Sequence, residues 1–156
     1  MGVQVGALGV IRWVAICGLL AAISVIDVRR RIVPNGLIVA IVGVQVAYLL
    51  LSAQDCVRAA HVLVQRGGES LAVMGVLLAA CVVADRVLGS ENLGGGDVKL
   101  IGALTFVLGL RGLFVALFAA SLFALAISAA LRRTARETFP FCPYLSCGCL
   151  MAILAG

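Results

Sequence analysis

Two aspartates, Asp27 and Asp97, stand at the ends of long apolar runs. Asp27 lies in SVIDVRRRIVPN, and Asp97 lies in ENLGGGDVKL. Carboxylates beside a membrane span are costly to bury, so they tend to mark function. A close pair of carboxylates can share one proton, so that one acts as general base on water and the other as general acid toward a peptide carbonyl. The two aspartates are therefore candidate catalytic residues for a hydrolysis that needs no metal ion and no cofactor.

Three glycines, Gly94, Gly95 and Gly96, come directly before Asp97. Consecutive glycines disfavour regular helix and let a second backbone approach closely. Non-helical backbone at membrane depth is tolerated where it lines a wet cavity. We therefore expect these glycines to form a substrate-binding stretch that holds an extended peptide beside the acid.

Each aspartate also has a purely structural interpretation. Asp27 comes just before the arginines at 29–31 and could form an interfacial ion pair with them. Asp97 could be the N-cap residue of the helix that it begins. Asp85 and Glu91 are rival acids in the same region, but they lack the flanking glycines. The residue types alone leave these alternatives open.

The composition indicates which elements must position these residues. The chain has 156 residues, of which 63% are hydrophobic and 12% charged, and its mean hydropathy is +1.20. A soluble domain is about half apolar and about a quarter charged, so the bilayer must solvate much of this chain. A helix needs roughly 20 apolar residues to cross a bilayer. We expect a single all-α domain over residues 1–156, a bundle of about six transmembrane helices at 5–26, 32–51, 71–88, 98–110, 113–131 and 143–155.

The basic residues predict an orientation for this bundle. With the N-terminus outside, the segments near 27–35, 85–99 and 132–142 face the cytoplasm and carry eight of the 12 basic residues. Both aspartates then lie at the cytoplasmic face, and residues 52–70 form an outer segment with room for a short interfacial helix. The net charge of +5 is explained by this pattern, and no basic block with interleaved aromatics predicts a nucleic-acid partner.

Metal-ligating residue types are sparse. The only histidine, His61, belongs to the expected outer segment, away from the aspartates. The six cysteines form no CxxC pair, and we expect them to pack as small apolar residues. The sequence therefore predicts neither a metal site nor a cofactor.

Three segments together resemble the type IV prepilin peptidases, membrane aspartic proteases of the GxGD class. The first holds Asp27, the arginines at 29–31, Pro34 and Asn35. The second is the GGGDVKL segment at 94–100, which includes Lys99. The third is the late Pro-Phe-x-Pro segment at 140–143, followed by a helix rich in small residues. The resemblance covers essentially the whole chain.

The resemblance implies a function that residue types could not supply. It implies that Asp27 and Asp97 are the catalytic pair, that Gly94 and Gly96 are the motif glycines, and that neighbouring Pro34, Asn35 and Lys99 support the motifs. The implied activity is removal of a short basic leader from prepilins or pseudopilins at the cytoplasmic face of the bacterial inner membrane. The implied partners are that substrate and membrane lipid, and the resemblance leaves the oligomeric state open.

The chain departs from the longer members of this family in two ways. It lacks the cytoplasmic segment with paired CxxC motifs, so it resembles the short, peptidase-only form of tight-adherence pilus systems, and N-methyltransferase activity stays open. Cys142 stands where a small residue such as glycine is expected, and we expect little consequence. Two other classes remain as alternatives: a non-catalytic membrane subunit of a pilus assembly, and a small transporter with acidic residues in its path.

Overall fold

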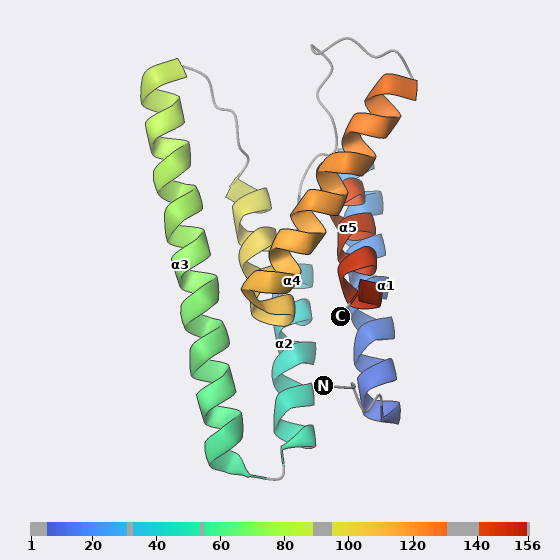
Figure 1. The fold of residues 1–156 in the computed structure, drawn as a ribbon, viewed down its shortest axis with the longest axis vertical. Coiled ribbons are helices and arrows are strands. Elements are labelled where there is room, and N and C mark those ends of the chain that lie inside the picture. The colour runs from blue at the N-terminus through green and yellow to red at the C-terminus, as the bar shows by residue number, and fades with distance from the viewer. Residues whose placement is uncertain (1–5, 31–32, 54, 89–94, 131–140, 156) are drawn as a thin grey trace.

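The computed structural model describes residues 6–30, 33–53, 55–88, 95–130 and 141–155. Within these ranges it contains five helices (Figure 1): α1 (Ala7–Arg30), α2 (Asn35–Ser52), α3 (Cys56–Leu88), α4 (Gly95–Ala130) and α5 (Phe141–Ala155). The all-α prediction is confirmed. The predicted number of six helices is wrong, because the fourth and fifth expected spans are joined in α4 without a loop between them.

The helix α4 contacts α2, α3 and α5, and it reverses direction near its middle. Gly109 has φ 74° and ψ 172°, a non-helical conformation that divides α4 into arms at 95–108 and 110–130. In Figure 1 the first arm runs down the view and the second runs back up. At 1.5 Å per residue the first arm is about 20 Å long, shorter than the roughly 30 Å of a hydrocarbon core. Gly109 therefore lies at membrane depth when Asp97 lies at an edge.

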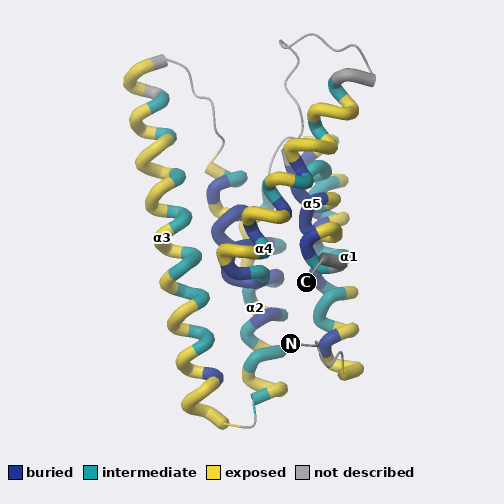
Figure 2. Tube along the Cα trace, in the orientation of Figure 1, coloured by how far each residue is buried: buried dark blue, intermediate teal, exposed yellow. Residues whose placement is uncertain are grey.

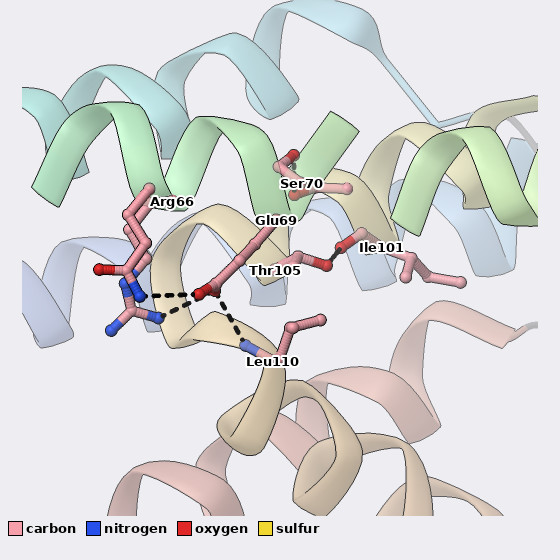
Figure 3. A network of polar contacts seen from close by, with 8 residues as sticks. Arg66, Glu69, Ser70, Ile101, Thr105 and Leu110 are labelled. Atoms are coloured by element: carbon pink, nitrogen blue, oxygen red, sulfur yellow. Dashed lines mark hydrogen bonds and ion pairs between the residues drawn. The ribbon is translucent and has the colours of Figure 1, made fainter. Parts of the chain in front are cut away.

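Side chains of α3 stabilise this turn (Figure 3). The Glu69 carboxylate accepts a hydrogen bond from the Leu110 backbone N–H at 3.3 Å and pairs with Arg66 at 4.0 Å. Ser70 donates to the Gly102 carbonyl of the first arm at 2.7 Å. An N–H at the start of a helix has no partner within that helix, so the Glu69 carboxylate satisfies a group that would be costly to leave bare in a membrane.

The prediction of a separate outer segment at 52–70 is also wrong. Residues 56–70 are helical and continuous with the expected third span, so α3 extends over 33 residues. Four polar side chains near the end of this stretch have partners on α4 or on α3 itself: Gln65, Arg66, Glu69 and Ser70. A polar stretch whose groups are satisfied in this way can stay helical at membrane depth.

The buried core lies where α1, α4 and α5 meet, and α2 contributes to it (Figure 2). Its fully buried side chains include Ile23 of α1, Ile41 of α2, Leu104 of α4 and Leu145 of α5. The contacts of α4 with α2, α3 and α5 make it the central element. Helices α1 to α4 have the length and hydropathy of membrane spans, and α5 is a shorter apolar helix.

Candidate active site

The two aspartates lie at the same end of the bundle. Asp27 is in the last turn of α1, and Asp97 is in the first turn of α4. In Figure 1 the end of α1, the start of α4 and the start of α5 lie toward the top. Asp27 is only 9% exposed, whereas Asp97 is partly buried. The helix directions thus bring together two acids that are 70 positions apart in the sequence.

Cys142, in the first turn of α5, contacts both carboxyl groups. Its backbone N–H donates to Asp27 Oδ2 at 3.4 Å, and its thiol donates to Asp97 Oδ1 at 3.9 Å. The first N–H groups of a helix lack partners within it, and the helix dipole favours negative charge at that position. Asp27 thereby satisfies the start of α5, and the two carboxyl groups converge on one residue.

This role of Cys142 was missed by the sequence analysis, which expected little consequence from a cysteine there. The residue is 0% exposed and belongs to the core cluster. The available signal was its place in the Pro-Phe-x-Pro segment, because the expected alternation of helices puts the start of the last helix beside both aspartates. Pro140 of that segment lies outside the described residues.

A hydroxyl pair fixes the position of α5 against α1 just below the acids. Ser24 Oγ and Ser146 Oγ are 2.8 Å apart, so that one hydroxyl can donate to the other. A carbonyl of the same helix is the alternative acceptor for each, that of Leu20 for Ser24 and that of Cys142 for Ser146. Hydrogen bonds between helices of this kind are typical of membrane bundles. Because Ser24 lies three residues before Asp27, the pair sets the height at which Cys142 meets that carboxylate.

The glycines before Asp97 are arranged differently from our expectation. Gly95 and Gly96 are the first residues of helix α4 rather than an irregular stretch, and Gly94 lies outside the described residues. A Cβ added to Gly96 would lie 3.1 Å from the Cβ of Val33, whereas one added to Gly95 would meet nothing within 4 Å. Gly96 therefore allows the start of α4 to approach the segment that leads into α2.

The motif-supporting residues meet at this same end. Pro34 is at the N-cap of α2 with φ −72° and ψ 122°, and Asn35 is the first residue of the helix. Lys99 Nζ donates to Asn35 Oδ1 at 3.4 Å, so the two motif segments are directly connected. Beside this pair a mainly apolar groove of about 410 Å³ continues between α2, α3 and the first arm of α4, where Met74 and Phe106 line it.

The purely structural interpretation of Asp27 predicts an ion pair with the arginines that follow it. Among the described residues, neither Arg29 nor Arg30 forms an ion pair with Asp27. His61 is exposed near the start of α3, at the opposite end of the bundle from the aspartates (Figure 1). Asp85 lies in α3 with its side chain outside the description, and Glu91 lies outside the described residues. Within the described ranges, no group of three or more histidines, cysteines or acids is placed to hold a metal ion.

Four apolar helices of membrane length indicate a multi-pass membrane protein, and two acids lie together at one end of its bundle. Residues 14–129 match the Type IV leader peptidase family, and the chain belongs to that family. It is similar to the prepilin leader peptidase/N-methyltransferase of Bacillus subtilis (strain 168), at 29% identity over 147 residues. The match covers 92% of this chain and 55% of that protein, so the chain spans about half the length of this curated relative. No solved structure matches the chain.

Proposed function

We propose that this protein is a membrane aspartic endopeptidase in which Asp27 and Asp97 activate water together. The observation that carries the proposal is the convergence of both carboxyl groups on Cys142 at one end of the bundle. Family membership supports a peptidase, and the paired acids supply a mechanism that uses this chain's own residues.

In this mechanism the two aspartates share one proton. The ionised carboxylate takes a proton from water, which attacks the scissile carbonyl carbon, while the protonated carboxyl donates its proton to the carbonyl oxygen. The tetrahedral intermediate then collapses, and the leaving amine takes a proton from the pair. Because both acids lie at helix ends, water and an extended peptide can reach them. The burial of Asp27 limits the number of further water molecules around the pair. Gly94, Gly95 and Gly96 are proposed to border the substrate.

The proposed substrate is the leader of a prepilin or pseudopilin, because the curated relative is a prepilin leader peptidase. Cleavage is proposed at the cytoplasmic face of the bacterial inner membrane, with the N-terminus outside. Cys56, an exposed residue at the start of α3, tests this orientation because it lies at the end opposite the aspartates. A membrane-impermeant maleimide should label it from outside in spheroplasts, and Cys56→Ser should remove that labelling. Labelling only after membrane disruption would refute the orientation.

Co-expression with a candidate prepilin, followed by a gel-shift assay for leader removal, tests the catalytic assignment. Asp27→Asn and Asp97→Asn should each lower cleavage by at least about 100-fold, the lower range for a lost acid or base. Asp55→Asn is the matched control, because Asp55 is exposed and lies between α2 and α3. It should cleave like the wild type. Near-normal cleavage by either active-site variant, at equal membrane levels, would refute the two-aspartate mechanism. Absence of cleavage by the wild type would favour a non-catalytic subunit.

A further inference from the structure

Cys142 is the residue through which the two candidate catalytic acids are connected. It uses two different groups for this: the backbone N–H reaches Asp27, and the thiol reaches Asp97. The side chain is completely buried, so water does not compete for the thiol. Every other cysteine lacks such a contact among the described residues.

The position of Cys142 is itself fixed by a contact between α5 and α1. Ser146 lies one turn further along α5. Its hydroxyl donates to the Cys142 carbonyl at 2.9 Å and can at the same time accept a hydrogen bond from Ser24 of α1, whose Oγ is 2.8 Å away. On the other side, α5 packs on the second arm of α4, where Gly148 lies against the backbone of Ala116 and Ala120. The first turn of α5 is therefore positioned by α1 and by the second arm of α4.

We propose that Cys142 is a positioning residue that sets the distance and orientation between the carboxyl groups of Asp27 and Asp97. This inference rests on the proposed two-aspartate mechanism. Its N–H fixes one carboxylate at the start of α5, and its thiol restrains the other, so that one water can bridge both acids. Catalytic groups must be held within a fraction of an ångström of the productive geometry, and a supporting contact of this kind supplies the restraint.

The side-chain part of this restraint can be removed without removing the backbone part. Cys142→Ala keeps the N–H and the Cβ but loses the donor to Asp97, whereas Cys142→Ser keeps a donor. We expect the alanine variant to lower kcat about tenfold, the effect of one hydrogen bond to a charged group, with KM unchanged. The serine variant should recover most of kcat, because a hydroxyl is a stronger donor than a thiol.

Cys149→Ala is the matched control, because Cys149 is also a buried cysteine of α5, whereas the contacts with the acids are made by Cys142. Purified variants in detergent should be compared for kcat, KM and thermal unfolding. The substrate should be a peptide that contains a prepilin leader, its cleavage site and the residues that follow. Loss of kcat in Cys142→Ala alone, with rescue by serine, supports positioning. Wild-type kcat in Cys142→Ala, or an equal loss in Cys149→Ala, would overturn it.

Asp27→Asn and Asp97→Asn in the same assay separate the two proposals. If both abolish cleavage while Cys142→Ala is unaffected, the mechanism stands and the positioning role is refuted. If either asparagine variant cleaves normally, the mechanism itself is refuted, and the role of Cys142 is refuted with it.

Discussion

Replacement of Gly148 by alanine should weaken the packing of α5 against α4. A Cβ at this position would overlap the Ala116 carbonyl of the second arm of α4 and would lie 3.0 Å from the Ala120 backbone nitrogen. These neighbours are backbone atoms within a helix, so they cannot rotate away as a side chain could. Small residues at such positions let membrane helices approach closely, and a methyl group there forces the helices apart.

The size of the effect follows from two opposing terms. Overpacking of a close contact costs about 1–3 kcal/mol, and the overlap with backbone places this site at the upper end. Alanine in place of glycine within a helix returns about 1 kcal/mol. The net loss is therefore about 2 kcal/mol of stability. Because α5 carries Cys142, its displacement should also lower leader cleavage.

Gly18→Ala provides the matched control for this substitution. Gly18 lies within α1, and a Cβ there would meet nothing within 4 Å, so the same change should be neutral or slightly stabilising. Thermal unfolding in detergent should show a lower Tm for Gly148→Ala and an unchanged or higher Tm for Gly18→Ala. Equal Tm values for the two variants would refute the close approach of α5 and α4.

Two other glycines give predictions of the same kind. Gly109→Ala should lower Tm, since φ 74° with ψ 172° is a region that only glycine adopts readily, at a cost of about 1–3 kcal/mol for other residues, and since the new methyl group would displace Arg66. Gly75→Ala, in open space, should leave Tm unchanged. An unchanged Tm for Gly109→Ala would contradict the turn. Gly96→Val should lower cleavage about tenfold by moving the start of α4 away from Val33, whereas Gly43→Val should leave the rate unchanged. Wild-type cleavage by Gly96→Val would contradict that close approach.

Hydropathy predicted the elements whose apolar runs are bounded by loops. Helices α1, α2 and α5 lie within a few residues of the expected spans. The same reasoning failed for α3, because it placed Arg66 and Glu69 in a separate outer segment, whereas Glu69 bonds to the turn of α4 and pairs with Arg66 within one continuous helix. It also failed between the fourth and fifth spans, where a single glycine reverses the chain and no polar loop is needed.

The candidate site was predictable in part for a related reason. Alternating helix direction is enough to place Asp27 and Asp97 at one end, since it depends only on the number of spans between them. Cys142 could not be chosen in this way, because its contacts depend on which face of α5 is turned toward the acids. That face is set by Ser24, Ser146 and the close approach at Gly148, which are packing details between distant segments.

The family match ends before α5, although α5 contacts both acids. Residues 14–129 contain both aspartates, and α5 begins at Phe141, beyond that region. Yet α5 contributes the N–H that meets Asp27 and the thiol that meets Asp97. The first arm of α4, about 20 Å long, ends at the Gly109 turn, and the second arm returns along α5. This return allows a short helix to complete the site: α5 packs on the second arm, and its first turn presents the Cys142 N–H to Asp27 and the Cys142 thiol to Asp97.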